Sequence, residues 1–233
     1  MAFTLSEVLI TLTIIGVIAA ITIPTVIANH QKETLKAQFT RAYSDLNNIS
    51  RKFYADNGIS FSEYGWEHTY LQNYAAFKKY IITTKHAVDT VDYSDPSTYT
   101  YKTTANVRTA HVCDDHGLFT DAGGRLFGLN NQNKENENGP IICVDTNGLR
   151  GPNKYGYDFF VFFFTVDGRV LPMGMEDDNN TSETDVGQNF FLTGSSYCNR
   201  KATNFKYNLT CAYYALNDKN PNNSNKSYWK DFL

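Results

Sequence analysis

The chain begins with a long run of apolar positions that contains one carboxylate near its start. Residues 8–28 carry no charged side chain, and as a helix this run is about 32 Å long, which is enough to cross a bilayer. Apolar residues then recur every three or four positions among polar ones, at Leu35, Phe39, Ala42, Leu46, Ile49 and Phe53. The pattern predicts one helix ending at Asn57-Gly58, with an apolar half over residues 3–29 and an amphipathic half over residues 30–57.

Residues 58–233 are expected to form a globular head. Its first part has a second helical pattern, carried by Trp66, Tyr70, Leu71, Tyr74, Phe77 and Ile81. Residues 83–104 follow as an irregular connection with one short strand. The later part predicts strands at Pro140–Val144 and Asp158–Val166, and a turn at Asp167-Gly168 that makes a hairpin with Arg169–Leu171.

The run FFVFFF inside the second predicted strand is apolar at every position. Such a strand must be covered on both faces, so we expect a central strand with the long helix on one side and loop on the other. The predicted fold class is therefore α+β, with a long N-terminal helix packed on an antiparallel sheet.

The apolar half has three interpretations: a cleaved secretory signal, a plain signal anchor, or a more specialised segment. A secretory signal has a basic start and a shorter apolar core. This chain has no Lys or Arg before its apolar run, and the run is longer, so a cleaved secretory signal is disfavoured. A plain anchor does not explain Glu7, because an ionised carboxylate in hydrocarbon costs roughly 2.5–3.5 kcal/mol on insertion scales. Thr4 and Glu7 match the T-x-x-E capping box, so one role of Glu7 is to cap the helix. That role does not exclude a second one.

The string AFTLSEVLITLTIIGVIAAITIP resembles the N-terminal signature of type IV prepilins and type II secretion pseudopilins. In that family a membrane peptidase cuts before a Phe, and the resemblance places the cut between Ala2 and Phe3, with Phe3 as the N-methylated first residue. Glu7 and Pro24 match the family's Glu and its helix-loosening proline. The resemblance implies that Glu7 is the countercharge of an α-ammonium, on its own chain or a neighbouring one, and that it sets the register of assembly.

The leader in this sequence is only Met1-Ala2, with Ala where the family more often has Gly, and it lacks basic residues. Lys32, Lys36 and Arg41 follow the apolar half, so the positive-inside rule alone would orient the segment the wrong way. We therefore expect the true start of translation to lie upstream.

A second resemblance covers VDTNGLRGPNKYGYDFFVFFFTVDGRVLPMG. Pilin-like proteins contain a similar Asp-x-Asn-Gly turn and Gly-Pro-Asn turn, followed by a Phe-rich hairpin. This resemblance implies an antiparallel sheet in the head, and no catalysis.

Four cysteines, Cys113, Cys143, Cys198 and Cys211, all follow the apolar half. An even number in an exported domain favours disulfides, and four cysteines allow three pairings. We expect Cys198–Cys211, which closes a loop near the C-terminus as the family's C-terminal disulfide loop does, and Cys113–Cys143. Each disulfide contributes on the order of 3 kcal/mol in the chain-entropy model.

Two clusters have residue types that bind metals. His111, Cys113 and His116 suit zinc, but no second cluster completes a tetrahedral site, so a disulfide is the preferred interpretation of Cys113.

The second cluster is an acidic loop with Glu176, Asp177, Asp178 and Asp185. Oxygen-rich loops can hold calcium, and some pseudopilins have such a site, but the EF-hand spacing is absent here. We expect no cofactor, with calcium at this loop as the alternative.

Charge and motifs narrow the function. The formal charge of −3 does not favour nucleic acid as a main partner, although residues 201–206 offer a local basic patch. The sequence has no nucleophile elbow, H-E-x-x-H or phosphate-binding loop, so an enzyme is not expected.

The resemblance implies a structural subunit, a pilin or pseudopilin, of a type IV pilus or type II secretion filament. It would be processed by prepilin peptidase and assembled with other subunits on an inner-membrane platform. It would stay in the bacterial inner membrane as a precursor and then enter a periplasmic or extracellular filament. The alternative is a membrane-anchored extracytoplasmic binding protein, such as an adhesin or a minor pilin tip that captures DNA or a surface.

Overall fold

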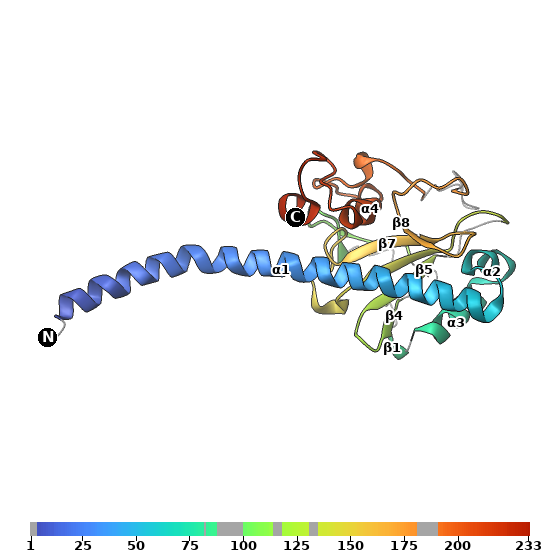
Figure 1. The fold of residues 1–233 in the computed structure, drawn as a ribbon, viewed down its shortest axis with the longest axis horizontal. Coiled ribbons are helices and arrows are strands. Elements are labelled where there is room, and N and C mark those ends of the chain that lie inside the picture. Colours follow the sequence, from blue (N-terminus) through green and yellow to red (C-terminus); the bar gives the residue numbers. More distant parts are fainter. Residues whose placement is uncertain (1–3, 82, 88–99, 114–117, 131–134, 181–190) are drawn as a thin grey trace.

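The computed structural model describes residues 4–81, 83–87, 100–113, 118–130, 135–180 and 191–233. Helix α1 (Leu5–Asn57) projects from the head as one continuous helix, and the head packs against its second half only (Figure 1). The helix ends at Gly58, which has a φ of 76° and donates its N–H to the carbonyl of Tyr54 at 2.8 Å. The predicted long helix on an antiparallel sheet is confirmed.

The amphipathic half of α1 forms one side of the core. Its buried residues follow the predicted spacing and are Phe39, Ala42, Leu46, Ser50 and Phe53. The ring of Phe39 lies 4.5 Å from that of Phe160 and 5.6 Å from that of Trp229, measured between centroids. The helix therefore serves as the spine of the head.

The main sheet has six antiparallel strands in the order β1-β4-β5-β6-β7-β8. Their bounds are β1 (Thr83–Ala87), β4 (Leu118–Asp121), β5 (Leu126–Asn130), β6 (Ile141–Asp145), β7 (Phe159–Phe164) and β8 (Val170–Pro172). A separate pair joins β2 (Tyr101–Lys102) to β3 (Arg108–Thr109). The two predicted strands and their hairpin are confirmed. Of the connection predicted over 83–104, the structure describes β1 and β2, and residues 88–99 lie outside the described part.

Strands β4 and β5 were not predicted. They flank the turn at residues 121–124, are four and five residues long, and include polar Thr120 and a glycine, Gly128. This composition gives no clear alternation of apolar and polar positions. Their partners in the sheet determine that they are strands.

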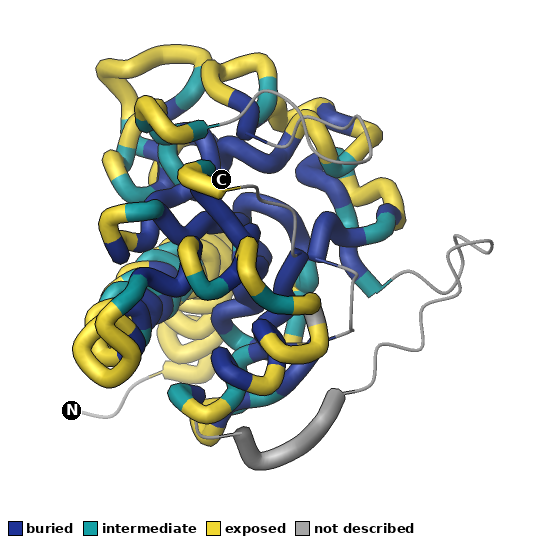
Figure 2. The backbone as a smooth tube through the Cα atoms, turned by 90° about the vertical axis from the view of Figure 1, so that its right-hand side faces the viewer, coloured by how far each residue is buried: buried dark blue, intermediate teal, exposed yellow. Residues whose placement is uncertain are grey.

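Strand β7 is buried at all six positions, as its composition predicted. Phe160, Phe162 and Phe164 belong to the core cluster beneath α1, and Phe163 belongs to a second cluster on the other face with Leu209. Figure 2 shows the buried segments of the head enclosed largely by exposed turns. The strand pairs with β6 on one side and β8 on the other, so it is an inner strand, as predicted, with only β8 beyond it.

The second helical pattern forms two helices instead of one, α2 (Phe61–Glu67) and α3 (Tyr70–Tyr80). His68 is extended, with a φ of −122°, and Thr69 starts α3 as its N-cap, with its backbone N–H bound to Gln72 Oε1 at 2.9 Å. Trp66 and Leu71, expected on the buried stripe, are 44% and 56% exposed. The break shifts the register of the stripe, so those two side chains face outward.

The C-terminal part of the head consists of short helices joined by turns. These are η3 (Ser195–Tyr197), η4 (Phe205–Asn208), α4 (Cys211–Leu216) and η5 (Tyr228–Phe232). The structure forms both expected disulfides: Cys198–Cys211 at the start of α4, and Cys113–Cys143 at β6.

Polar contacts hold the amphipathic half of α1 along its length. At its start the Lys36 ammonium lies 2.8 Å from Asp218 Oδ2. In the middle, Arg125 bridges Asp45 on the helix and Asp121 at the end of β4, with N···O distances of 2.8 and 2.7 Å. Near its end, Ser50 donates to the carbonyl of Gly168, in the β7–β8 turn, at 2.8 Å. The head thus fixes this half at three separated levels.

Candidate assembly site

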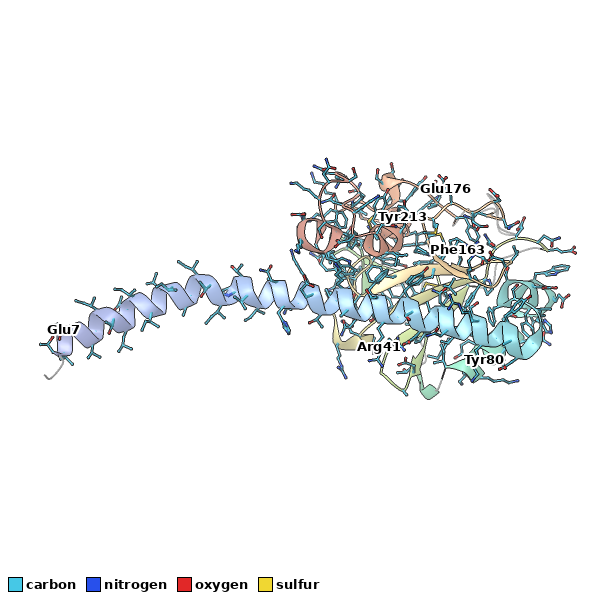
Figure 3. The ribbon with its side chains drawn as sticks, in the orientation of Figure 1. Glu7, Arg41, Tyr80, Phe163, Glu176 and Tyr213 are labelled. Atoms are coloured by element: carbon cyan, nitrogen blue, oxygen red, sulfur yellow. A yellow bond between two sulfur atoms is a disulfide. The ribbon has the colours of Figure 1, made fainter. Side chains whose placement is uncertain are left out.

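The apolar half of α1 protrudes from the head with its side chains uncovered by the rest of the described chain. The large apolar residues from Leu5 to Ile27 are exposed by 43% at Val8 and up to 78% at Leu5. Figure 3 shows Glu7 at the free end, remote from the head. Soluble monomers rarely expose an apolar patch larger than a few hundred Å². This segment therefore requires lipid or other protein around it.

The polar groups within this segment are satisfied by the helix itself. The hydroxyls of its threonines donate to carbonyl oxygens three or four residues earlier, at 2.9, 2.8, 2.9 and 3.5 Å, for Thr11, Thr13, Thr22 and Thr25. Pro24 lies inside the helix without ending it and removes one backbone donor. A hydrocarbon environment demands such internal hydrogen bonding. The helix is long and apolar enough to cross a membrane.

The free end of α1 is closed by the predicted capping box. The backbone N–H and the hydroxyl of Thr4 both donate to Glu7 Oε2, each at 2.8 Å, and the Glu7 N–H donates to Thr4 Oγ1 at 3.3 Å. Within the described residues, both bonds to this carboxylate end on one oxygen. The cap thereby holds a carboxylate at the tip of the helix, four residues after Phe3, the residue that follows the expected cut.

Four of the predicted site residues lie outside the described part of the chain. These are Ala2 and Phe3 at the expected cut, His116 of the zinc-like cluster, and Asp185 of the acidic loop.

The zinc-like cluster is divided between two structural roles. Cys113 is bound in the disulfide with Cys143, so its thiolate is not free to bind a metal. His111 is 2% exposed, and its ring lies 5.6 Å from that of Tyr101 and 6.1 Å from that of Phe159. Among the residues that the structure describes, no group of three or more His, Cys, Asp or Glu side chains could hold a metal ion.

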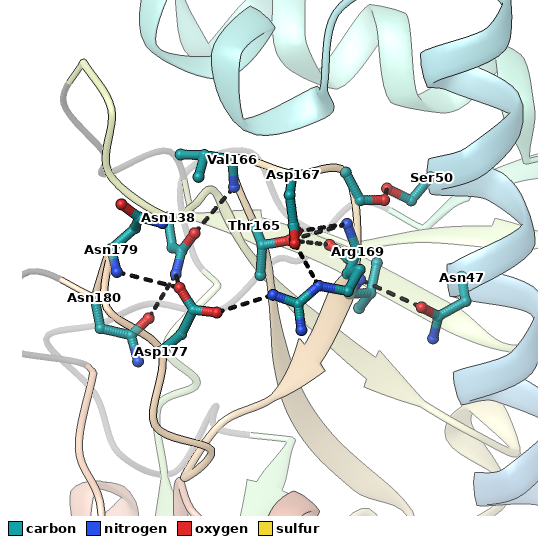
Figure 4. A network of polar contacts seen from close by, with 12 residues as sticks. Asn47, Ser50, Asn138, Thr165, Val166, Asp167, Arg169, Asp177, Asn179 and Asn180 are labelled. Carbon is teal, nitrogen blue, oxygen red and sulfur yellow. Dashed lines mark hydrogen bonds and ion pairs between the residues drawn. The ribbon is translucent and has the colours of Figure 1, made fainter.

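In the acidic loop, Asp177 already has donors on both carboxylate oxygens. Oδ1 accepts from Asn138 Nδ2 at 2.9 Å and from the Asn179 N–H at 3.1 Å, and Oδ2 accepts from Arg169 Nη2 at 3.1 Å (Figure 4). Glu176 and Asp178 are exposed. A calcium ion at Asp177 would have to displace the Arg169 guanidinium.

The same network connects the loop to α1. Arg169 Nε donates to Asp167 Oδ2 at 2.6 Å, and Asn47 on the helix accepts the N–H of Val170 at 3.3 Å (Figure 4). A chain of hydrogen bonds and ion pairs therefore connects the loop, the β7–β8 turn and α1. Its structural role is to hold the head against the helix.

The Asp-x-Asn-Gly and Gly-Pro-Asn turns meet at two buried carboxyl groups. Asp158 accepts the backbone N–H groups of Asn153 and Lys154 at 2.8 and 2.7 Å, and Asp145 accepts that of Asn147 at 3.2 Å. Both carboxyl side chains belong to fully buried residues. Burial raises the pKa of Asp158 to about 6, and burial followed by the nearby charge of Asp158 raises that of Asp145 well above its usual range. The sequence therefore predicted the two turns. It did not predict that they are held together through Asp145 and Asp158.

Glycine is required in the first of these turns. Gly148 has a φ of 66°, and a Cβ on it would lie 2.2 Å from the carbonyl oxygen of Gly124. No other residue fits this close approach to the β4–β5 turn.

We expect the acid pair to lower the stability of the head as the pH rises. Because the folded pKa values exceed the unfolded value of about 4, the folded chain binds more protons than the unfolded chain between about pH 4 and pH 7, and the free energy of unfolding falls over that range. The shift of Asp158 alone corresponds to about 3 kcal/mol. Asp145→Asn removes one charge and should be more stable than the wild type by about 1–3 kcal/mol near neutral pH, with little difference near pH 4.

Urea unfolding of the full chain in nonionic detergent across this pH range measures the effect. Asp178→Asn removes an exposed carboxyl and is the matched control. Hydrogen bonds from Lys36 and Ser227 outweigh partial desolvation and lower the pKa of Asp218 to about 2, so that group acts below this window. Parallel pH curves for wild type and Asp145→Asn would contradict the prediction.

Comparisons of the chain with models of known families, with curated proteins and with solved structures find no match.

Proposed function

We propose that the chain is a structural subunit, a pilin or pseudopilin, of a type IV pilus or type II secretion filament. The precursor would lie in the bacterial inner membrane, be cut between Ala2 and Phe3 by prepilin peptidase, and enter the filament through the apolar half of α1. Its partners would be other subunits and the inner-membrane assembly platform.

One observation carries the proposal, and it concerns the two halves of α1. The second half packs in the core of the head, while the first half extends beyond the head as an uncovered apolar helix, with the Glu7 carboxylate at its tip. The apolar half of α1 needs a partner surface along its whole length, since its apolar side chains are exposed on every side. The apolar halves of other copies, packed side by side, would supply such a surface.

Glu7 favours this function over a plain anchor. In a plain anchor Glu7 would serve only as the helix cap, and its charge is costly to bury at the apolar end of the helix. In a bundle, the same carboxylate can pair with the ammonium created by cleavage before Phe3, and methylation of that amine keeps its charge. A mismatched stack would leave the charge without a partner, so the pairing would select one register.

The intact mass and N-terminal peptide of the protein from its native membrane test the proposal. We expect a chain that begins at N-methylated Phe3. An unprocessed N-terminus, in a host whose prepilin peptidase is active on another substrate, would refute the proposal and leave a membrane-anchored binding protein as the interpretation.

A further inference from the structure

A cavity of about 540 Å³ lies where α1 enters the head. The helix contributes Lys32 and Leu35 to its wall, and the loop after β6 contributes Pro152, Lys154 and Tyr157. The C-terminus, which also lines the cavity through Leu233, lies at the end of the head nearest the protruding helix (Figure 1). Two lysines line this space against one acidic group, the α-carboxylate of Leu233, and no Asp or Glu side chain, so the lining is net cationic.

Lys154 is an unusual residue for a cavity wall, because it is a lysine that is only 7% exposed. Its ammonium lies 4.2 Å from the centroid of the Tyr157 ring, and the ion pairs of the described chain do not include it. Burial lowers the pKa of Lys154, and the neighbouring charges of Arg200 and Lys102 lower it further, while Asp158 opposes them. An anion in the cavity would relieve this concentration of positive charge.

Lys32 faces the same space from α1 and donates to the carbonyl of Lys230 at 2.9 Å. It is the first cation after the uncharged run that ends at Ala28, and four residues of helix span about 6 Å. The headgroup layer of a bilayer is several ångströms thick on each side of the hydrocarbon. With the apolar half in the membrane, the cavity lies at the level of the headgroups.

We propose that this cavity binds the phosphate of an anionic phospholipid headgroup, with Lys32 and Lys154 as the cations that hold it. The site depends on membrane insertion of the apolar half, which is part of the proposed function, but not on filament formation. A bound headgroup would hold the head at a fixed height and orientation on the membrane while the precursor waits, and it would be released when the subunit leaves the bilayer.

Native mass spectrometry of the full chain from mixed micelles tests this site. The micelles contain equal amounts of phosphatidylglycerol, which is anionic, and phosphatidylcholine, which is zwitterionic. We expect the wild type to retain phosphatidylglycerol preferentially. Lys32→Gln and Lys154→Gln should each lower that preference about fivefold, which is the contribution of one basic residue near an anionic surface. Lys79→Gln, on α3 at the opposite end of the head, removes an equal charge and should have no effect.

Lys32→Gln keeps the experiment decisive if Lys154→Gln fails to fold, because Lys32 is only partly buried. Equal retention of the two lipids by the wild type, or an unchanged preference in Lys32→Gln, would overturn the proposal. Displacement of the lipid by soluble glycerol phosphate would also overturn it, in favour of a site for a free phosphate. Resistance of each variant to alkaline extraction from membranes reports insertion separately, so a failed lipid site is distinguishable from a failed membrane anchor.

Discussion

Glu7→Ala is expected to leave the protein synthesised and processed but nearly absent from filaments. The carboxylate is the only acidic group within residues 3–29, and in the proposed filament its loss would leave the ammonium at Phe3 without a countercharge inside the helix bundle. An uncompensated charge in hydrocarbon costs roughly 2.5–3.5 kcal/mol on insertion scales, which corresponds to about a hundredfold loss of incorporation. Immunoblots of sheared filaments against the membrane fraction measure the ratio.

Glu7→Gln separates the two roles of this residue. A glutamine side chain can still accept from Thr4 and complete the capping box, but it carries no charge. If the countercharge sets assembly, Glu7→Gln is incorporated as poorly as Glu7→Ala. Normal incorporation of Glu7→Gln would mean that the cap alone is required, and the countercharge role would be wrong.

Phe39→Ala should destabilise the head by about 3–5 kcal/mol, the usual cost of removing a buried aromatic ring. Phe39 is 1% exposed and is the first buried residue of α1. Its ring packs between strand β7, through Phe160 and Phe162, and Trp229 of the C-terminal helix η5. Three separate segments, α1, β7 and η5, meet at this ring. No shift of one segment alone would therefore close the space left by the substitution.

Denaturant unfolding of the full chain in detergent, followed by tryptophan fluorescence, measures this cost. Trp229 is buried and responds to loss of the core, whereas Trp66 is largely exposed. The matched control is Thr40→Ala, one residue further along α1 and exposed, which should change the free energy of unfolding by no more than about 0.5 kcal/mol. A loss below about 1 kcal/mol in Phe39→Ala would contradict the packing of the helix on the sheet.

Local patterns in the sequence were sufficient for the features made by neighbouring residues. The capping box of Thr4 and Glu7, the stop at Gly58 and the turn at Asp167-Gly168 each depend on a few consecutive positions. The apolar periodicity of α1 is likewise read within one element. The prediction and the structure agree on these features, as they do on the two disulfides and the β7–β8 hairpin.

Apart from the break between α2 and α3, the features that were missed bring together residues distant in the sequence. Lys32 and Lys154 share a cavity only because the loop after β6 lies beside α1, and Asp145 approaches Asp158 only because β6 pairs with β7. Strand β4 was missed for a similar reason, since pairing with β1 and β5 makes it a strand. The spacing of apolar and polar residues along one segment does not show which distant segment packs against it.

Pro24 lies roughly four turns of helix before Phe39, in the part of α1 that the head does not touch. A proline at that position removes a backbone hydrogen bond that would otherwise resist bending. The polar and aromatic contacts that hold the head all begin further along the helix. Bending at Pro24 can therefore tilt a rigid head without breaking any contact within it. In an assembly of many copies, this would place mechanical compliance in the helical core, so that the fibre could flex under load while every head stayed folded.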